Sequence, residues 1–306
     1  MLRLSFLFGI FLYFFPITAA CSQVDHIVIP FQLIGNTIII QAGVQDRSGF
    51  FVLDSGSPNL VLNTKHFENI RMDATSFHST DLTGTASNTL TQTIVHLKVG
   101  NIERRNQKAF LIDLSRIEQG KKINILGVIG YKFLKQFEIL FDYQQKEITL
   151  FALDRKGERM AKSSLHTPPN HVFDLKKSSH FLYLEAQIGN ETIKLGLDCG
   201  AETSVLDKDA VRSFKNHFFP SHGVSLIAFN GKKSSVNIGS VRQVFIGNTE
   251  LELFEVIVMD LESINQNLVV KLDGLLGNGS LSRNKIAINY KKQTLSIWDP
   301  TWLAKR

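Results

Sequence analysis

Short runs of Ile, Val, Phe and Thr follow one another along most of the chain, and Gly, Asn and Asp separate them. Runs rich in β-branched and aromatic residues are typical of strands that lie half buried in a sheet. The pattern predicts strands at residues 37–42, 50–53, 93–99, 108–112 and 147–151. Helical patterns are few, and they predict short helices at residues 64–67, 131–137 and 208–214. We therefore expect an all-β chain with few short helices.

The first twenty residues have the pattern of a secretory signal peptide. One cation, Arg3, precedes a run rich in Leu and Phe that extends to Phe15, and small residues follow Pro16. A charged start, a short apolar centre and a small-residue exit are the parts of such a signal. The uncharged run is also just long enough to form a membrane anchor. We predict removal of residues 1–20 and export to the periplasm, the cell envelope or the outside.

Cys21 directly follows the small residues Thr18, Ala19 and Ala20. This stretch resembles the bacterial lipobox, in which a Cys after small residues is acylated, although the lipobox usually has Leu where Thr18 stands. A lipid-anchored protein and a soluble exported protein therefore both remain open. If Cys21 is acylated or lost, Cys199 has no partner, so we expect no disulfide framework and a fold that depends on packed β-structure.

The composition is that of a globular chain that can bury a sizeable core. Hydrophobic residues make up 43% and charged residues 20% of the 306 residues, which argues against a disordered chain, a collagen or a coiled coil. The formal charge of +6 is basic, but the sequence has no run of five like charges and no basic stretch interleaved with aromatic residues. We interpret the excess as solvated surface and expect no nucleic acid partner.

Three blocks of sequence recur in the same order at nearly constant spacing. An apolar strand runs into Asp54-Ser-Gly-Ser in the first half and into Asp198-Cys-Gly-Ala in the second. Residues 126–130 match residues 273–277, and residues 141–151 match residues 288–298, so that the offsets are 144, 147 and 147 residues. This pattern indicates an internal duplication.

The length fits two domains of average size. Residues 154–171 are polar and end in the turn signal at Pro168, Pro169 and Asn170, so we place a linker there. The predicted organisation is a signal peptide at 1–20, a first lobe at 24–153, the linker at 154–171 and a second lobe at 172–300.

Each repeat presents an Asp at the end of an apolar strand, shortly before a Gly that allows the backbone to turn closely. A single Asp-Ser-Gly triplet is usually a turn or a helix cap, but a two-fold arrangement of a duplicated chain brings equivalent loops together. Two carboxylates a few ångströms apart cannot both ionise easily, so one keeps its proton. Such a pair holds a base and an acid together, as hydrolysis of an amide by activated water requires.

These loops resemble the active-site loops of aspartic peptidases. Residues 54–60 are similar to the pepsin-type sequence Asp-Thr-Gly-Ser-x-Asn-Leu, and residues 198–201 to the retroviral Asp-Thr-Gly-Ala. Residues 128–130 and 275–277 resemble the apolar-apolar-Gly segments that support each loop in that family. The resemblance covers about residues 30–298. It implies a bilobal acid-protease fold, in which two retropepsin-like β-barrel lobes are related by a pseudo-two-fold axis.

The same resemblance assigns roles to individual residues. Asp54 and Asp198 would be the catalytic pair, and no cofactor or metal would be required. Ser57 would hydrogen-bond to the carboxylate of Asp54. Residues that resemble the flap over the substrate are Leu82, Thr83, Gly84 and Thr85, with residues 229–231 as a weaker counterpart. Residues that would shape or support the catalytic loops are Ser55, Gly56, Ser57, Cys199, Gly200 and Ala201.

Three positions depart from the family pattern. The residue after each Asp is usually Thr, whose hydroxyl bonds across the lobes. Ser55 can do this, whereas Cys199 is a weak donor that would weaken one side. Ala201 has no hydroxyl beside Asp198, and Leu82 stands where pepsin-type flaps carry Tyr.

Cys199 and three histidines near the linker are further candidate functional residues. Cys199 has no neighbouring His or basic cluster that would lower its pKa, so we do not expect a thiol nucleophile. The histidines at positions 166, 171 and 180 fit no standard metal site, and we expect them to be solvated around the linker.

The resulting hypothesis is a monomeric aspartic endopeptidase that cuts peptide or protein substrates. The alternative is a catalytically silent envelope protein of the same fold that binds extended peptides by strand addition.

Overall fold

A computed structural model of the chain describes residues 26–68, 70, 73–80, 86–160, 167–227 and 233–298. The predicted signal peptide, Cys21, the predicted flap residues 82–85 and their counterpart at 229–231 lie outside the described residues.

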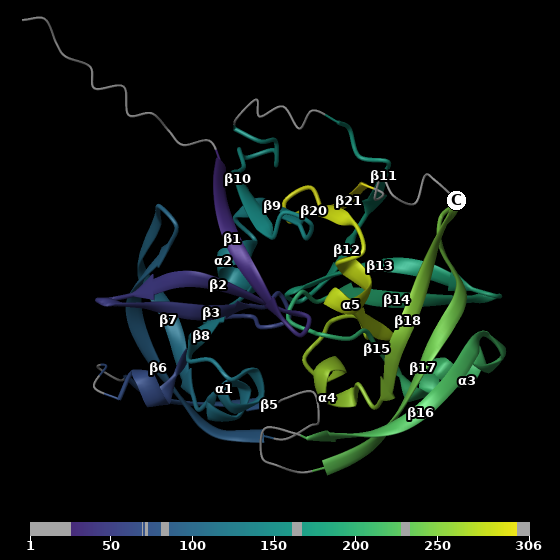
Figure 1. The fold of residues 1–306 in the computed structure, drawn as a ribbon, viewed down its shortest axis with the longest axis horizontal. Coiled ribbons are helices and arrows are strands. Elements are labelled where there is room, and N and C mark those ends of the chain that lie inside the picture. Colours follow the sequence, from purple (N-terminus) through teal and green to yellow (C-terminus); the bar gives the residue numbers. More distant parts are fainter. Residues whose placement is uncertain are drawn as a thin grey trace, which may run out of the picture.

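Strands dominate both halves of the described chain, which confirms the predicted all-β class (Figure 1). The first half contains β1 (His26–Ile34), β2 (Thr37–Val44), β3 (Arg47–Leu53), β4 (Leu60–Asn63), β5 (Asp73–Thr80), β6 (Ala86–Val99), β7 (Ile102–Ile112), β8 (Ile125–Ile129), β9 (Phe137–Asp142) and β10 (Glu147–Ala152). The second half contains β11 (His171–Asp174), β12 (Lys176–Ser178), β13 (Phe181–Ile188), β14 (Glu191–Leu197), β15 (Val205–Asp207), β16 (Phe218–Ile227), β17 (Lys233–Ile246), β18 (Thr249–Met259), β19 (Gly274–Leu276), β20 (Lys285–Asn289) and β21 (Thr294–Trp298).

The helices are short. Those of the first half are η1 (Thr64–His66), α1 (Ser115–Lys121) and α2 (Tyr131–Leu134), and those of the second are α3 (Lys208–Ser213), η2 (Lys215–His217), α4 (Glu262–Asn265) and α5 (Asn278–Leu281). The predicted helix at 131–137 is too long, because α2 ends at Leu134 and the buried Phe137 begins β9.

The two halves repeat one strand arrangement around the loops that carry Asp54 and Asp198. In the first half, β8 pairs in parallel with β3 and antiparallel with β4, and β4 pairs in parallel with β7. In the second half, β19 pairs in the same way with β14 and β15, and β15 with β18. The duplication in the sequence is therefore a duplication of structure, with one lobe on each side of Figure 1.

A six-stranded antiparallel sheet in the order β11-β21-β20-β9-β10-β1 joins the lobes, and each half contributes three strands (Figure 1). At its centre β9 pairs with β20, and Leu140 lies opposite Ala287. These two residues are 147 apart, which is the offset of the sequence repeat. The pseudo-two-fold axis therefore passes through this pair of residues.

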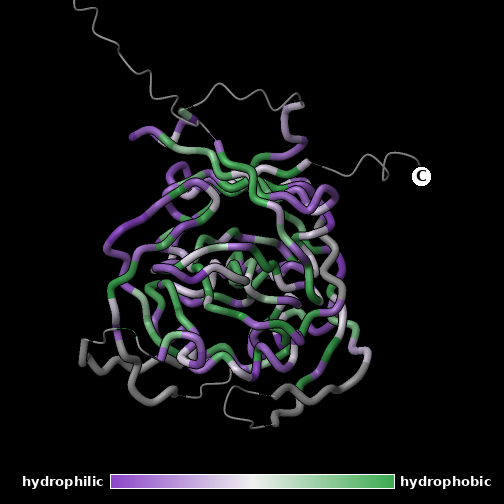
Figure 2. The backbone as a smooth tube through the Cα atoms, turned by 60° about the vertical axis from the view of Figure 1, so that its left-hand side comes forward, coloured by the Kyte–Doolittle hydropathy of each residue, from purple (hydrophilic) through white to green (hydrophobic). Residues whose placement is uncertain are grey.

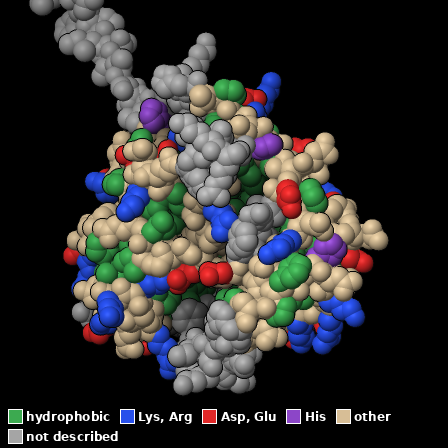
Figure 3. Space-filling model, turned by 45° about the vertical axis from the view of Figure 1, so that its right-hand side comes forward, with side chains coloured by type: hydrophobic (Ala, Val, Ile, Leu, Met, Phe, Trp, Pro, Cys, Tyr) green, Lys and Arg blue, Asp and Glu red, His purple; other side chains and the backbone are tan. Residues whose placement is uncertain are grey.

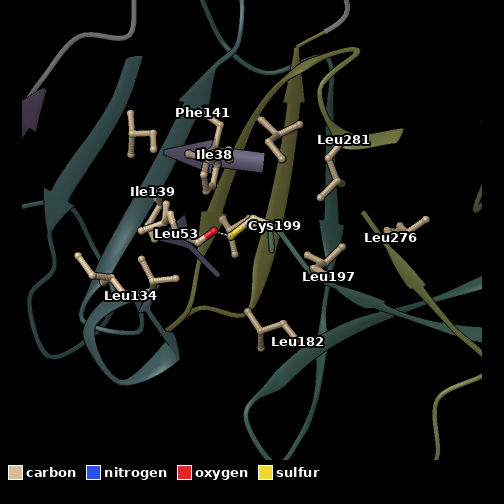
Figure 4. Packing of buried hydrophobic residues seen from close by; sticks show 14 of the residues in the cluster. Ile38, Leu53, Leu134, Ile139, Phe141, Leu182, Leu197, Cys199, Leu276 and Leu281 are labelled. Carbon is tan, nitrogen blue, oxygen red and sulfur yellow. Dashed lines mark hydrogen bonds between the residues drawn. The ribbon is translucent and has the colours of Figure 1, made fainter. Parts of the chain in front are cut away.

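One apolar core continues from the first lobe into the second. Apolar segments gather in the interior and hydrophilic ones mark many of the turns at the rim (Figure 2). Where the lobes meet, Leu53 and Leu197 lie near Cys199, and all three side chains are buried (Figure 4). Truncation of a buried Leu to Ala typically costs about 2–5 kcal/mol of stability, so this core fixes the two Asp loops relative to each other.

The predicted linker is partly packed against the shared sheet. The guanidinium of Arg159 lies 4.0 Å from the ring centroid of Phe151, and Arg159 also forms a salt bridge with Glu138. The indole N–H of Trp298 donates to the carbonyl oxygen of Thr167 at 3.0 Å. Strand β11 begins at His171, the last residue of the predicted linker.

Basic and acidic side chains are interspersed over the face drawn in Figure 3. Several form exposed ion pairs, such as Lys176 with Glu185 and Lys208 with Asp260. Within the described ranges, no helix combines the length and the apolarity that a membrane crossing requires.

Candidate active site

The two Asp loops follow equivalent strands and are held by equivalent supports. Asp54 follows β3, and its backbone N–H donates to the carbonyl of Ile129 at the end of β8, at 3.0 Å. Asp198 follows β14, and its N–H donates to the carbonyl of Leu276 at the end of β19, also at 3.0 Å. Parallel pairing of β3 with β8 and of β14 with β19 therefore places both aspartates at the junction of the lobes.

The glycine that ends the first support is required by close packing. A Cβ at Gly130 would lie 2.3 Å from the carbonyl oxygens of Ser57 and Asn59. Because a real Cβ does not approach an oxygen so closely, any other residue here would displace the first loop. The next residue, Tyr131, donates its backbone N–H to the carbonyl of Ser57 at 2.8 Å.

The carboxyl groups of Asp54 and Asp198 lie side by side and share a hydrogen-bond donor. The backbone N–H of Gly56 lies 2.8 Å from Oδ1 of Asp54 and 3.2 Å from Oδ1 of Asp198, so it serves both carboxyls. A Cβ at Gly200 would lie 2.1 Å from Oδ1 of Asp54, and one at Gly56 would lie 2.6 Å from Oδ2 of Asp198. Only glycine at these two positions permits the approach.

Backbone N–H groups supply the other contacts to the carboxylates. Ser57 donates its N–H to Oδ1 of Asp54 at 3.1 Å, and Gly200 donates its N–H to Oδ1 of Asp198 at 2.9 Å. The predicted bond from Ser57 to Asp54 therefore comes from the backbone, because the Ser57 hydroxyl donates to the carbonyl of Asn59 at 3.1 Å instead. Ala201, which has no hydroxyl, donates its backbone N–H to the backbone carbonyl of Asp198 at 3.3 Å.

Ser55 and Cys199 form reciprocal bonds across the lobes, and both are buried. The Ser55 hydroxyl donates to the carbonyl of Leu197 at 3.3 Å and accepts the N–H of Cys199 at 2.9 Å. In turn, Sγ of Cys199 accepts the N–H of Ser55 at 3.3 Å and lies 3.7 Å from the carbonyl of Leu53 (Figure 4). The Cys199 thiol stands where the family usually has a hydroxyl. Its contact with the carbonyl of Leu53, at 3.7 Å, is longer than the contact of the Ser55 hydroxyl with the carbonyl of Leu197, at 3.3 Å.

Burial raises the pKa of the Cys199 thiol to about 12. The thiol therefore stays protonated at all ordinary pH values, and its environment does not suit a nucleophile.

The environment of the aspartate pair favours retention of a proton. Burial raises the pKa of both carboxyls, and the adjacent charge of Asp198 together with its hydrogen bond raises the pKa of Asp54 further, to about 8. Asp198 is only 6% exposed, whereas Asp54 is half-buried and keeps a face toward solvent. One carboxyl of the pair thus keeps a proton at neutral pH while the other can ionise.

The family model for aspartyl proteases matches residues 40–133 and 184–279, which is more than half of the chain. The chain belongs to the aspartyl protease family. Each matched region lies in one lobe and contains one of the paired aspartates, which confirms the predicted pair of retropepsin-like repeats. No curated protein sequence matches the chain.

Two tyrosines lie beneath the loops of this aspartyl protease family member, and sequence reasoning assigned them no role. The Tyr290 ring centroid lies 5.8 Å from that of Tyr131, and burial raises the pKa of the Tyr290 hydroxyl well above its usual value. Tyr143 donates its hydroxyl to Oδ1 of Asn278 at 2.9 Å, and Nδ2 of Asn278 donates to the carbonyl of Cys199 at 2.7 Å. Tyr143 and Tyr290 occupy equivalent positions in the third repeated block, and that recurrence could have identified them.

The expectation that the linker histidines are solvated is wrong for His180. Its ring is half-buried, and Nε2 donates to the carbonyl of Gly56 at 2.8 Å. His171 also has structural contacts, because it stacks on Phe173 and hydrogen-bonds to Thr249 through Nδ1. His166 lies outside the described residues. Among the described residues, no group of three or more His, Cys, Asp or Glu side chains could hold a metal ion.

The strands that flank the predicted flap residues form an antiparallel hairpin in each lobe. Thr80 of β5 lies opposite Ala86 of β6, and Ile227 of β16 lies opposite Lys233 of β17. The flap residues Leu82, Thr83, Gly84 and Thr85 themselves lie beyond what the structure describes.

Proposed function

We propose that the protein is an aspartic endopeptidase, which hydrolyses peptide bonds with a water molecule held between Asp54 and Asp198. The observation that carries the proposal is the close pair of carboxyl groups from the two lobes, both served by the single N–H of Gly56. This pair retains one proton because burial and mutual repulsion oppose a second negative charge.

In the proposed reaction the ionised carboxylate of the pair takes a proton from the water, and the water oxygen attacks the carbonyl carbon of the substrate. The protonated carboxyl gives its proton to the carbonyl oxygen, so the intermediate is a neutral gem-diol. When the C–N bond breaks, the protonated carboxyl gives its proton to the leaving nitrogen and the other carboxylate takes a proton from a hydroxyl of the gem-diol, so the pair again holds one proton. No covalent bond between enzyme and substrate forms.

Backbone groups give this pair its geometry before any substrate binds. The N–H groups of Gly56, Ser57 and Gly200 point at the carboxylate oxygens, and backbone donors cost little to reorganise during reaction. The bonds between Ser55 and Cys199 keep the two loops at a fixed separation. Both halves of the pair come from one chain, so a monomer suffices.

The proposed substrates are extended segments of peptides or proteins, because the reaction requires a backbone amide next to both carboxyls. The N-terminal sequence pattern supports a site of action outside the cytoplasm, with or without a lipid on Cys21. Mass spectrometry of the mature N-terminus distinguishes an acylated Cys21 from a free one.

Cleavage of a denatured protein between about pH 3 and 7, where such a pair holds one proton, tests the proposal. We expect Asp54→Asn and Asp198→Asn each to reduce turnover by at least about 100-fold, while Asp46→Asn, which changes an exposed Asp of the same lobe, leaves it unchanged. Loss of activity in only one of the first two variants contradicts a shared pair. A wild type that binds peptides without turnover supports the silent binding protein instead.

A further inference from the structure

His180 reaches from the second lobe to the catalytic loop of the first. Its Nε2–H donates to the carbonyl of Gly56 at 2.8 Å. That carbonyl belongs to the peptide group between Gly56 and Ser57, whose N–H donates to Oδ1 of Asp54 at 3.1 Å. A single peptide group therefore connects the imidazole to the carboxylate. A donor on the carbonyl polarises the peptide and strengthens the bond that its N–H makes.

The surrounding structure holds the imidazole in place. His180 lies in the turn between β12 and β13, and its ring centroid lies 4.4 Å from that of Phe181 and 6.3 Å from that of Tyr131. The buried hydroxyl of Ser178 anchors the turn, because it donates to the carbonyl of Val270 at 2.7 Å and accepts the N–H of Val270 at 2.8 Å.

The charged groups around His180 come from three elements. Asp198 at the end of β14 acts on it electrostatically, and the ammonium groups of Lys135 and Lys177 lie 5.5 and 5.4 Å from the ring centroid of Tyr131, which contacts the imidazole. Burial lowers the pKa of His180, so its ring is neutral at neutral pH. A neutral imidazole can still donate from Nε2, because one ring nitrogen always carries a hydrogen.

The equivalent position in the first lobe makes a different contact. Asn36 precedes Asp54 by the same eighteen residues that separate His180 from Asp198. Its Nδ2 donates to the carbonyl of Glu202 at 3.1 Å. The N–H of the same peptide group belongs to Thr203, whereas the N–H of this loop that donates to the Asp198 carboxylate belongs to Gly200. The two lobes therefore differ. The peptide group that His180 contacts also donates to the Asp54 carboxylate, whereas the peptide group that Asn36 contacts lies further along the chain from Asp198.

We propose that His180 is a positioning residue of the catalytic pair: it fixes the Gly56–Ser57 peptide and thereby stabilises the ionised form of Asp54. Its effect on catalysis rests on the proposed endopeptidase function, whereas its effect on the proton affinity of the pair does not. Loss of the donor weakens the bond from Ser57 to Asp54, so the carboxyl pair must bind its protons more tightly.

The test is a pH titration of the folded protein labelled with ¹³C in its Asp carboxyl groups, with signals assigned through Asp54→Asn and Asp198→Asn. His180→Phe keeps a planar ring beside Phe181 and Tyr131 but has no donor. We expect it to move the titration of the pair upward by about 0.4–1 pH unit. His180→Gln places an amide N–H near the position of Nε2, and we expect it to restore most of the wild-type titration.

Two further comparisons serve as controls for this test. Asn36→Ala changes the equivalent cross-lobe contact and should leave the titration of the pair unchanged. If His180→Phe does not fold, as a thermal melt reports, His180→Gln is compared with His180→Asn, whose shorter amide cannot reach the carbonyl of Gly56. A titration that is the same in donor and non-donor variants overturns the proposal.

The titration does not depend on turnover, so the two hypotheses can fail separately. In an active protein, His180→Phe should also shift the acid limb of kcat/KM to higher pH, and His180→Gln should restore it. An active wild type with an unshifted His180→Phe titration refutes the role of His180 alone. An inactive wild type with a shifted titration refutes the endopeptidase proposal alone.

Discussion

Replacement of Asp54 by Asn should change how the stability of the fold depends on pH. The folded protein raises the pKa of Asp54 from 3.8 to about 8. Between these values the folded state holds a proton that the unfolded state has released, so the free energy of unfolding falls as pH rises through this window. The amide of the Asp54→Asn variant does not titrate, and it resembles the protonated carboxyl in shape. The variant therefore lacks this loss of stability.

The magnitude follows from the shift in the pKa. Each pH unit corresponds to about 1.4 kcal/mol, so the full movement sets an upper limit of roughly 6 kcal/mol. Asp54 keeps one face toward solvent, which screens the interaction, and we expect about 2–4 kcal/mol. Wild type and Asp54→Asn should thus have similar stability at pH 4, and the variant should be the more stable by this amount above pH 8.

Chemical denaturation of both proteins at a series of pH values from 4 to 9 measures the difference. Asp46→Asn, on the exposed surface of the same lobe, serves as the control and should run parallel to the wild type. If the curves of Asp54→Asn and wild type also run parallel, the two carboxyls do not share a proton in the folded protein. The assignment of Asp54 and Asp198 as an acid–base pair then fails with it.

Three other substitutions test the framework of the site. Gly200→Ala places a Cβ 2.1 Å from Oδ1 of Asp54 and should abolish turnover and lower the melting temperature, whereas Gly120→Ala, where a Cβ meets nothing within 4 Å, should be neutral or stabilising. Tyr143→Phe removes the hydroxyl that donates to Oδ1 of Asn278 at 2.9 Å and should lower the free energy of unfolding by about 1 kcal/mol; an unchanged value shows that this bond contributes nothing. Contacts with His66, Lys65 and the N–H of Ile125 lower the pKa of Glu118 to about 2. Glu118→Gln should therefore cost about 1–3 kcal/mol at pH 7, and denaturation curves should show the difference shrinking as pH falls from about 4.5 to 2.

The repeated blocks identified the two paired Asp loops because their signal is local. An apolar strand, an Asp and a Gly follow one another within a few residues, and two copies at a constant offset made the pattern specific. The helix predicted at 131–137 was too long because its end depends on contacts with a strand elsewhere in the chain. Its residues are compatible with a helix, but Phe137 is buried through the pairing of β9 with β10, which local sequence does not reveal.

Contacts between distant segments escaped prediction. His180 and Gly56 are 124 residues apart, and nothing near His180 in the sequence distinguishes it from a solvated linker residue. The hydroxyl of Ser57 shows the same limit on a smaller scale, because it and the backbone N–H of the same residue compete for partners. Which of them meets the carboxylate depends on where the turn places the carbonyl of Asn59.

The chain by itself determined its strands, its duplication and the two acidic loops, because each depends on residue types within short reach of one another. The tertiary structure alone decided that the loops touch, that Gly56 serves both carboxyls, and that His180 and Tyr290 lie against them. These contacts arise when strands from both halves pair in the sheet that joins the lobes. The tertiary structure also decides the proton affinity of the pair, because this affinity depends on burial and on a neighbouring charge that only the assembled lobes provide.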